Sequence, residues 1–357
     1  MANLVRTHFG TERMKVLIAD AFAERGRQAL GHSGIEVVYD PGLKDSDLLR
    51  AVRSEGPDVL VVRSTLVSSE LLRASSLSLV VRAGSGYNTI DVEAASASGT
   101  YVANCPGTNA IAVAELAFGL ILALDRRIPA NLVDLQRGLW NKGTYSDAGG
   151  IHGRTLGLIG LGAVGQAMVP RAAAFGMDVV TWSRSLTPER AGQLGVAMKQ
   201  SADEVAAESD VVSVHVALSE QTRHLIGPPF FEAMRPGAIF INTSRAEVVD
   251  ERSLAAAVQG KRIRAGLDVF EGQPSGSSGE VKNALFALDG VIGTHHIGGS
   301  TDQAQQMIAE EVVRIIREFR DTGVPPNAVN SLSRHSLPGK SCGWGGEEAA
   351  VKGISCS

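Results

Sequence analysis

The chain has 357 residues, of which 44% are hydrophobic and 20% charged, with a formal net charge of -4. These values are typical of a folded globular protein with two domains, since a domain averages about 150 residues. Lys and Arg are spread along the chain, so nothing indicates a nucleic acid or an anionic membrane as partner, and a small molecule is the expected ligand.

The three cysteines, Cys105, Cys342 and Cys356, have no metal-ligand spacing and form no even-numbered disulfide framework. They predict a reducing, cytoplasmic setting and no bound metal. The longest apolar run contains Glu115, and its uninterrupted part, residues 116–124, is far shorter than the roughly 20 residues that span a bilayer. It predicts a buried helix.

Residues 1–13 lack an apolar signal core and predict a loose extension. From Met14 onward, short β-branched apolar runs alternate with helical patterns, which is typical of βα units around a parallel sheet. The strands expected in this first series are 15–19, 35–39, 59–64, 78–84 and 100–105, with helices at 45–54 and 68–75.

A second series begins with "RTLGLIGLGAVGQAM" and continues through strands expected at 178–184, 210–218, 238–245, 264–270 and 291–296. A long helix broken near Pro129 precedes it, and an amphipathic helix opened by Ser300 and Thr301 follows it. The fold class predicted is α/β with two doubly wound parallel-sheet domains. A Rossmann-type cofactor domain (116–299) would be inserted into a flavodoxin-like substrate domain (14–115 plus 300–330), and the Ser- and Gly-rich tail (331–357) predicts disorder.

A GxGxxG turn between a strand and a helix is formed by Gly160, Gly162 and Gly165. Its amides and the helix N-terminus favour a pyrophosphate, so we predict an NAD(P) site. At the tip of the next strand, Ser183 and Arg184 stand where NAD sites usually carry a carboxylate. A hydroxyl followed by a guanidinium favours the 2′-phosphate of NADP, and the alternative is an exposed Arg184 with NAD held elsewhere.

Three later segments each follow a strand on the carboxyl side, where doubly wound sheets bind ligands. They carry Arg245, then Asp268 with Gln273, then His295 with His296. A guanidinium can bind a carboxylate and polarise the adjacent carbonyl, and an imidazole can supply a proton when a hydride arrives. Taken singly, Arg245 suits a surface ion pair and His296 a buried core position. Together they predict hydride transfer to a 2-oxo acid.

Seven motifs occur in one order: "RAGSGYNTIDVEAA", "NCPGTNAIAVAELA", "GLIGLGAVG", "DVVSVHVALSEQTRHLIG", "MRPGAIFINTSRAEVVDE", "LDVFEGQP" and "THHIGGSTDQAQ". With them the chain resembles the D-isomer-specific 2-hydroxyacid dehydrogenases from Met14 to Asn330, and most closely their phosphoglycerate branch. The resemblance implies an active site between the two domains, a homodimer and a role in serine biosynthesis. The residues after Asn330 are too few and too polar for the C-terminal regulatory domain of the ACT type that longer members carry.

The resemblance also assigns roles by motif. Arg245 would bind the substrate and His296 would be the acid/base, with His295 only a neighbour. Further substrate contacts would come from Arg63, Arg82, Gly84, Ser85, Gly86 and Asn109, with the substrate carboxylate on the amides of residues 84–86. The cofactor would contact Gly160, Gly162, Ala163, Val164, Gly165, Ser183, Arg184, Val216, Ala217, Thr222, Thr243, Ser244, Arg245, Asp268, His296 and Gly298.

One departure concerns the acid that pairs with the histidine in this family, because that position is Gln273 here. Glutamine can orient the imidazole but brings no charge, so the proton-donating form of His296 should be scarcer near neutral pH. Three alternatives stay open: a glyoxylate or hydroxypyruvate reductase, a formate dehydrogenase-like enzyme, which also has glutamine there and needs no acid/base step, and a catalytically weak NAD(P)-binding regulator. Glu271 could replace the missing acid only after a loop shift.

Overall fold

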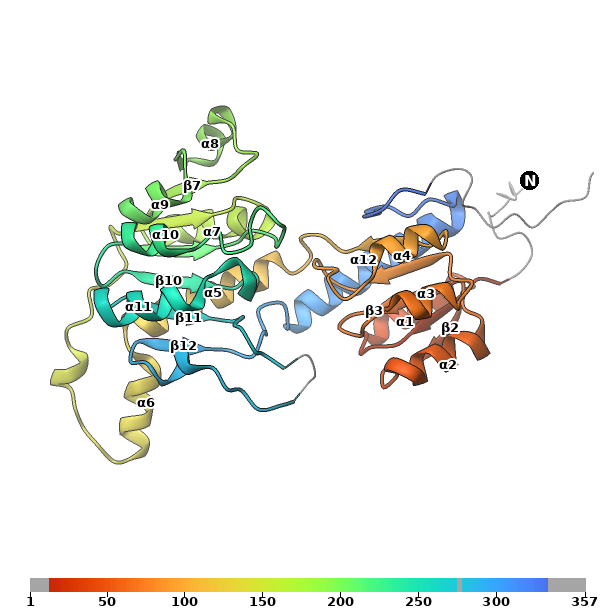
Figure 1. Ribbon diagram of the computed structural model, residues 1–357, viewed down its shortest axis with the longest axis horizontal. Coiled ribbons are helices and arrows are strands. Elements are labelled where there is room, and N and C mark those ends of the chain that lie inside the picture. The colour runs from red at the N-terminus through yellow and green to blue at the C-terminus, as the bar shows by residue number, and fades with distance from the viewer. Residues whose placement is uncertain (1–12, 275–277, 333–357) are drawn as a thin grey trace, which may run out of the picture.

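The computed structural model describes residues 13–274 and 278–332 and contains two parallel sheets. The first has strand order β2-β1-β3-β4-β5 and the second β12-β11-β10-β9-β6-β7-β8. Figure 1 shows them as two lobes joined by the long helices α5 and α12. The predicted fold class is confirmed. The expectations of a loose extension at 1–13, a disordered tail at 331–357 and no ACT-type domain stay predictions, because residues 1–12 and 333–357 lie outside the described residues.

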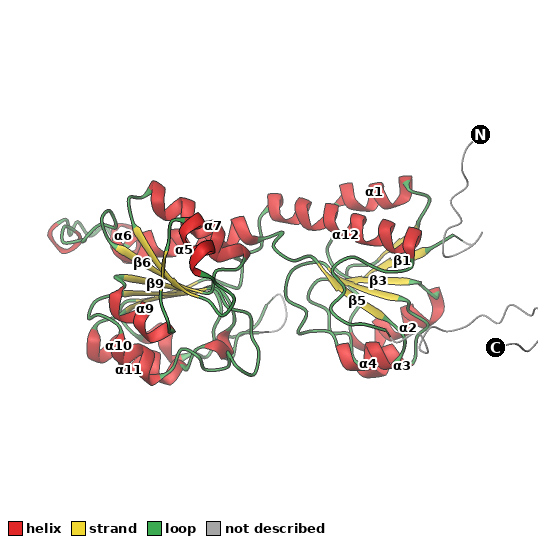
Figure 2. Ribbon diagram, turned by 90° about the horizontal axis from the view of Figure 1, so that it is seen from above, coloured by secondary structure: helices red, strands yellow, loops and turns green. Residues whose placement is uncertain are grey.

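The first sheet is built from β1 (Lys15–Ile18), β2 (Glu36–Tyr39), β3 (Val59–Val62), β4 (Leu79–Arg82) and β5 (Tyr101–Asn104). One face is covered by α1 (Glu24–His32) and α12 (Asp302–Thr322), and the other by α2 (Asp45–Glu55), α3 (Ser69–Arg73) and α4 (Val92–Ala97), as Figure 2 shows. The strand order reverses between β1 and β3, so a ligand crevice is expected at their carboxyl ends.

The second sheet runs through β6 (Thr155–Ile159), β7 (Asp178–Trp182), β8 (Ala197–Met198), β9 (Val211–Val214), β10 (Ile239–Asn242), β11 (Arg264–Leu267) and β12 (Val291–Gly293). Helices α5 (Ala110–Asp125), α7 (Ala163–Ala174) and α8 (Pro188–Leu194) cover one face, and α9 (Ala202–Glu208), α10 (Pro228–Ala233) and α11 (Glu251–Lys261) the other. Short 3-10 turns occupy Gly143–Tyr145, Ala246–Val248 and Ala284–Ala287. The order reverses between β6 and β9, again at the carboxyl ends.

The long helix expected after the first series is broken as predicted, but Pro129 is not the residue that breaks it. The residue between the two halves, Arg127, has a left-handed φ of 50°, and α6 (Ile128–Gln136) starts anew after it. Pro129 lies in the first turn of α6, where a missing N–H costs nothing. Helix α5 itself is buried, and its Glu115 pairs with Arg171 of α7 at 3.0 Å.

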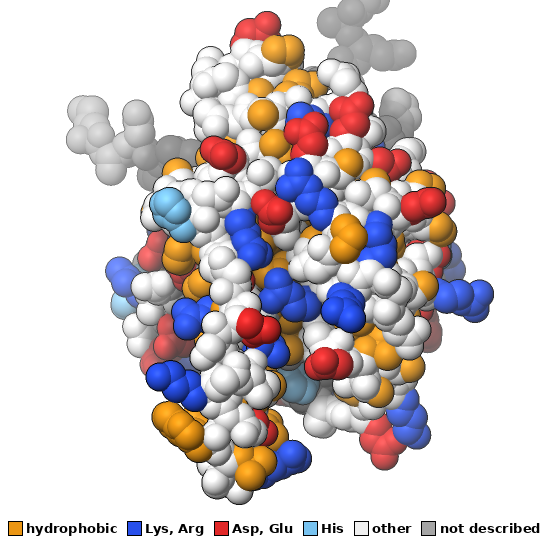
Figure 3. Space-filling view, turned by 90° about the vertical axis from the view of Figure 1, so that its left-hand side faces the viewer, with side chains coloured by type: hydrophobic (Ala, Val, Ile, Leu, Met, Phe, Trp, Pro, Cys, Tyr) orange, Lys and Arg blue, Asp and Glu red, His pale blue; other side chains and the backbone are white. Residues whose placement is uncertain are grey.

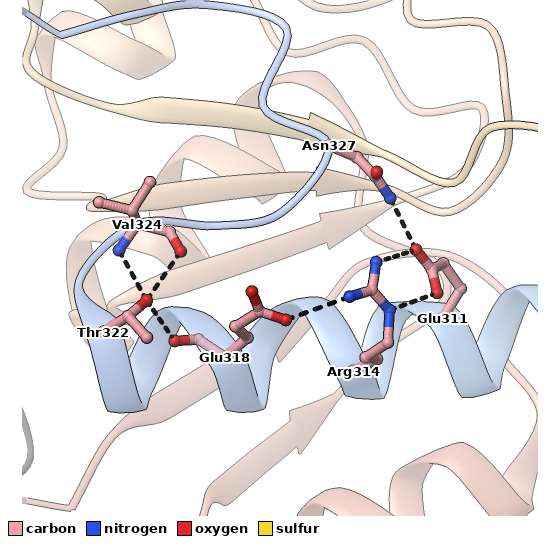
Figure 4. Close-up of polar contacts among 6 residues, drawn as sticks. All are labelled: Glu311, Arg314, Glu318, Thr322, Val324 and Asn327. Carbon is pink, nitrogen blue, oxygen red and sulfur yellow. Dashed lines mark hydrogen bonds and ion pairs between the residues drawn. The ribbon is translucent and has the colours of Figure 1, made fainter.

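Helix α12 brings the chain back to the first sheet. Thr301 caps it by accepting a hydrogen bond from the amide of Ala304 at 3.1 Å, and its buried face packs on the first sheet. Figure 4 shows Asn327 donating to Glu311, which is also held by Arg314. The amide of Val329 then bonds to β5. The domain division at 115/116 and 299/300 stays a proposal, because α5 runs through the first of these points.

A membrane-spanning helix was not expected from the sequence. Within residues 13–274 and 278–332, no helix combines the length and the apolar character needed to cross a bilayer.

Candidate active site

The glycine loop connects β6 to α7. Gly160 has a φ of 97°, and a Cβ there would press on the backbone of the loop after β9, so glycine is required. Gly162 is the N-cap residue of α7, and Ala163 and Val164 form its first turn. A Cβ on Gly165 would overlap the carbonyl oxygen of Gly160, so the helix approaches the strand closely. Its free N-terminal amides are suited to a pyrophosphate.

The other residues predicted to meet the cofactor follow β9 and β10. Val216 and Ala217 lead into a turn that the buried Thr222 closes, because its hydroxyl donates to the Ala217 carbonyl at 2.6 Å. After β10, the Ser244 hydroxyl donates within its own loop, whereas the buried hydroxyl of Thr243 has no partner among the described residues. An orphaned buried hydroxyl at the same sheet edge as the glycine loop fits a nucleotide cofactor that would complete its hydrogen bonding.

The tip of β7 is cationic. Ser183 is half-buried and Arg184 is exposed, with no carboxylate at either position. A second arginine, Arg190 of α8, donates to the side chain of Gln166 at 3.1 Å, just past the glycine loop. Sequence reasoning missed Arg190, because only the fold brings α8 back against α7.

Arg245 leaves the end of β10 and reaches the first sheet. Its Nη1 donates to the Ser244 carbonyl at 2.7 Å, and its Nη2 occupies the space that a Cβ on Gly86 would need. Burial lowers the pKa of Arg245, and the nearby Glu247 acts in the opposite direction. The guanidinium is therefore partly stripped of water and lies between the two sheets, where an anionic ligand would stabilise it.

His296 is paired with the uncharged Gln273. The amide Nε2 of Gln273 lies 3.1 Å from Nδ1 of His296, and the buried Oε1 of Gln273 has no partner among the described residues. The pKa of His296 is lowered first by loss of hydration, which is partial because the ring is exposed, and then by the charges of Arg245 and Arg82. Asp268 opposes them. Glu271 is exposed and not in this pair.

Asp268 holds the loop that carries the histidine. Its Oδ1 accepts from the Thr294 hydroxyl at 2.6 Å and from the Ile297 amide at 2.8 Å, and its Oδ2 accepts from the Gly298 amide at 2.8 Å. The Asp268 carbonyl also accepts from the His296 amide at 2.9 Å. Asp268 and Gly298, both predicted as cofactor contacts, therefore bind each other in this structure. His296 has a φ of 52°, and these bonds stabilise that left-handed backbone.

Two more arginines come from the first sheet. Arg63 follows β3, and Arg82 is the last residue of β4. Burial, and then the like charges of Arg245 and Arg63, lower the pKa of Arg82 to about 10. The Nε of Arg82 is buried without a partner among the described residues. Three guanidinium groups thus converge, and this crowding favours an anion among them.

A second glycine loop, residues 84–86, follows β4 of the first sheet and is held by Asn109. The Ser85 hydroxyl donates to the Asn109 side chain at 3.0 Å. The amide of Gly84 donates to the Arg82 carbonyl at 2.8 Å, so the prediction that residues 84–86 bind the substrate carboxylate narrows to Ser85 and Gly86. A Cβ on Gly84 would collide with Arg82, as one on Gly86 would with Arg245. Because these glycines have no Cβ, the guanidinium groups of Arg82 and Arg245 fit beside them.

A nucleotide-binding loop, an arginine and a histidine on one sheet thus meet two arginines and a glycine loop on another. This arrangement defines a two-domain α/β protein whose facing sheet edges suit a nucleotide cofactor on one side and a small anion on the other. The family profile of the D-isomer specific 2-hydroxyacid dehydrogenase NAD binding domain matches residues 118–298. The chain belongs to the D-isomer specific 2-hydroxyacid dehydrogenase family.

Its relatives carry several names. The D-3-phosphoglycerate dehydrogenase of Methanocaldococcus jannaschii is 38% identical over 311 residues, covering 85% of this chain and 58% of that protein. The hydroxypyruvate reductase of Thermotoga maritima is 38% identical over 315 residues, covering 87% of this chain and 99% of that protein. Among solved structures, the TT0316 protein from Thermus thermophilus has a TM-score of 0.77 at 32% identity, covering 89% of this chain and 100% of that one. The chain thus spans little more than half the length of the phosphoglycerate dehydrogenases it matches.

Proposed function

We propose that the chain is an NAD(P)-dependent D-2-hydroxyacid dehydrogenase that interconverts 3-phosphohydroxypyruvate and D-3-phosphoglycerate, the first step of serine biosynthesis. The observation that carries this proposal is the meeting of Arg245 and His296 with Arg63 and Arg82 at the facing edges of the two sheets. Phosphoglycerate dehydrogenase is also the name of relatives that are 38% identical.

In the proposed reduction, Arg245 binds the substrate carboxylate and draws electron density from the adjacent carbonyl. A nicotinamide held at the glycine loop of Gly160, Gly162 and Gly165 would supply the hydride. His296 gives the proton on Nε2 to the carbonyl oxygen, which completes the 2-hydroxy acid, and the neutral ring takes that proton back in the reverse direction. The amides of Ser85 and Gly86 assist Arg245 in holding the carboxylate.

Gln273 makes the proton step less efficient than a carboxylate would. As a donor to Nδ1, its amide favours the neutral ring with its proton on Nε2, which can hydrogen-bond a carbonyl but is not the form that gives up a proton. The imidazolium needs an acceptor at Nδ1, and turning the amide would bring the orphaned Oε1 to it. The cation is thus tolerated but not charge-stabilised. The same neutral pair supports formate oxidation as a second candidate function, since that reaction moves a hydride without an acid/base step.

The phosphate of the substrate would be bound by Arg63 and Arg82. A guanidinium gives a phosphate two parallel hydrogen bonds, and Arg82 has a buried Nε with no partner among the described residues. The competing substrates are hydroxypyruvate and glyoxylate, because a hydroxypyruvate reductase is matched over 99% of its length and a glyoxylate reductase of Thermococcus litoralis over 92%. Neither molecule has a phosphate to occupy these two arginines.

For the cofactor we propose a preference for NADP over NAD. Ser183 can donate to a 2′-phosphate, and Arg184 is exposed beside it. A carboxylate that would accept from the ribose hydroxyls is missing at both positions. The cytoplasmic setting also stays a proposal, based on the cysteine usage.

One assay separates these candidates. Initial rates of the purified protein are measured with NADH and NADPH against 3-phosphohydroxypyruvate, hydroxypyruvate and glyoxylate, and with NAD and NADP against formate. The expected result is the highest kcat/KM with 3-phosphohydroxypyruvate and NADPH. Preference for an unphosphorylated oxo acid would favour the reductase, turnover of formate would favour the second candidate, and cofactor binding without any turnover would favour a regulatory protein.

We also propose a homodimer, formed through the arm of residues 126–148. Its apolar side chains are exposed: Ile128, Leu132, Val133, Leu135, Leu139 and Trp140. Figure 3 shows the side of the molecule on which this arm lies, and hydrophobic side chains gather at its lowest projecting part, where Figure 1 has α6. Six large apolar side chains exposed together on a projecting arm suit a second copy. Light scattering should give twice the chain mass, and Leu132→Asp should give the monomer mass; a monomeric wild type would refute the dimer.

A further inference from the structure

Asp20 lies outside the acid/base pair and outside the cofactor site, yet it makes an unusual set of bonds. It follows β1 at the reversal between β1 and β3, and its Oδ2 accepts from the amides of Arg63 at 2.6 Å, Ser64 at 3.1 Å and Thr65 at 3.0 Å. Its Oδ1 accepts from the Ser64 hydroxyl at 3.3 Å. One carboxylate thus gathers three successive amides of the neighbouring strand end.

Successive backbone amides that point at one spot form a nest, and such nests commonly bind a ligand anion. Here a side chain of the protein itself fills the nest. Burial alone would raise the pKa of Asp20, but the bonds from Arg63, Thr65 and Ser64 outweigh it and lower the pKa, so the carboxylate is ionised at neutral pH. The backbone of residues 63–65 is therefore fixed by a permanent anion and does not wait for a ligand.

The residue fixed in this way is Arg63. Its Nη2 donates to the hydroxyl of Ser300 at 3.1 Å. Ser300 lies four residues after His296, at the entry to α12. The amide nest therefore sets the direction of a guanidinium that spans from the first sheet to the loop carrying the histidine.

Charge gives Asp20 a second effect on the same group of side chains. The charges that act on Arg82 include the like charges of Arg245 and Arg63, and they include Asp20 with the opposite sign. A carboxylate that faced the ligand would repel an anionic substrate, but the lone pairs of Asp20 are turned to amides. The charge of Asp20 is the smallest of the effects on the pKa of Arg82, so the bonds that fix the backbone of Arg63 are its main influence on the site.

We propose that Asp20 is a positioning residue of the substrate site, which fills the amide nest of residues 63–65 and thereby holds Arg63 toward the distal anionic group of the substrate. The inference rests on the proposed function, because it assigns Arg63 a substrate. Asp20 touches neither the substrate nor the cofactor in this scheme. It acts through Arg63, so its effect should vanish when Arg63 is removed.

The test is a double-mutant cycle with Asp20→Asn, Arg63→Ala and the double variant, read as KM and kcat for 3-phosphohydroxypyruvate. Asp20→Asn should raise the substrate KM roughly tenfold, as expected when a charged hydrogen-bond acceptor is lost, with kcat and the cofactor KM little changed. In the Arg63→Ala background the same change should have no further effect on KM. Asp40→Asn is the matched control, since Asp40 follows the neighbouring strand β2 and its carboxylate accepts from the Gly42 amide in its own turn.

An unchanged KM in Asp20→Asn, or effects that add in the double variant, would overturn the inference. So would equal losses of substrate and cofactor affinity with a lower Tm, since that is the pattern of a merely structural residue. If Asp20→Asn does not fold, Asp20→Ser replaces it in the cycle. Calorimetry with inorganic phosphate tests the role of Asp20 separately from the proposed function. If the wild type binds phosphate more tightly than Asp20→Asn but reduces no oxo acid, the proposed function is refuted and the role of Asp20 is supported.

Discussion

The two sheets have the same architecture, but their carboxyl edges present different chemical groups. The edge of the first sheet presents charged side chains, Arg63 and Arg82, above a carboxylate that is turned inward. The edge of the second sheet presents the backbone amides of the glycine loop and the neutral pair of His296 and Gln273, with Arg184 exposed at the tip of β7 and Arg245 reaching across. The same doubly wound fold can thus bind an anion through guanidinium groups or through a helix N-terminus.

The difference also affects the protein's own energetics. On the first sheet, like charges and burial lower the pKa of Arg82 to about 10, a strain that a bound anion would relieve. On the second sheet, the acid/base pair of His296 and Gln273 carries no net charge, and its loop is anchored by Asp268. Affinity for the distal phosphate should therefore depend on the first sheet, whereas the second sheet should supply Arg245 for the carboxylate and His296 for the chemical step.

The largest effect is expected for His296→Asn, which tests whether the chemical step belongs to the second sheet. Loss of a positioned general acid costs about 10² to 10⁴-fold in rate. The kcat for oxo-acid reduction should fall by that factor, while cofactor affinity, measured by nucleotide fluorescence titration, should change far less. His295→Asn is the matched control, because its side chain is the neighbour on the same loop. Retained kcat in His296→Asn would break the comparison.

Gly86→Ala tests the point at which the two edges meet. The new Cβ would collide with Nη2 of Arg245, so the guanidinium must leave its place. Because charged hydrogen bonds contribute about 1.5 to 3 kcal/mol, we expect the substrate KM to rise about 10 to 100-fold with the cofactor KM unchanged. Gly42→Ala serves as the control, since its Cβ would find only ordinary contact with Asp40. A change in cofactor affinity instead would show that the edges are not separable.

Most of the fold could be predicted from the sequence because its signals are local. The alternation of β-branched runs with helical periods predicted both sheets, and Gly160, Gly162 and Gly165 predicted the turn into α7. The break after α5 was predicted near Pro129, but a left-handed Arg127 makes it. Proline marks where a helix can begin, and an unremarkable residue adopted the strained conformation. Sequence patterns do not report such a φ angle.

The site was predictable only where each residue carries its own chemistry. Arg245, Gln273 and His296 follow separate strands. Because ligands bind at the carboxyl ends of parallel strands, the sequence predicted that these three side chains lie close together. Asp20 and Arg190 were missed because their significance lies in bonds to distant segments, 43 to 45 residues away for Asp20 and 24 for Arg190. An aspartate after a strand is common, and only the geometry reveals three amides around it.

Gln273→Glu would add a charge to the acid/base pair on the second sheet, and so tests what the neutral glutamine does there. Loss of hydration and the charges of Arg245 and Arg82 lower the pKa of His296, and a carboxylate at Nδ1 would raise it by about one to three units. Reduction needs the imidazolium, which is present below this pKa and lost as the pH rises through it. The basic limb of the pH profile of reduction should therefore move upward by a similar amount. Glu271→Gln should leave the profile unchanged, and an unmoved limb in Gln273→Glu would contradict the assignment.

The smallest effect is expected for Arg184→Ala, which tests whether charge recognition extends to the second sheet. Arg184 is exposed, and an exposed ion pair is worth at most about 1 kcal/mol, so the ratio of kcat/KM for NADPH over NADH should fall by up to roughly fivefold. Salt should weaken the wild-type preference, because exposed charges are screened. Arg190→Ala should act in the same direction, since Arg190 is held near the glycine loop by Gln166. Arg223→Ala provides a control on another loop of the same sheet. If neither Arg184→Ala nor Arg190→Ala changes the ratio, the second sheet recognises its nucleotide through backbone amides alone, and the division between the two edges is sharper than proposed.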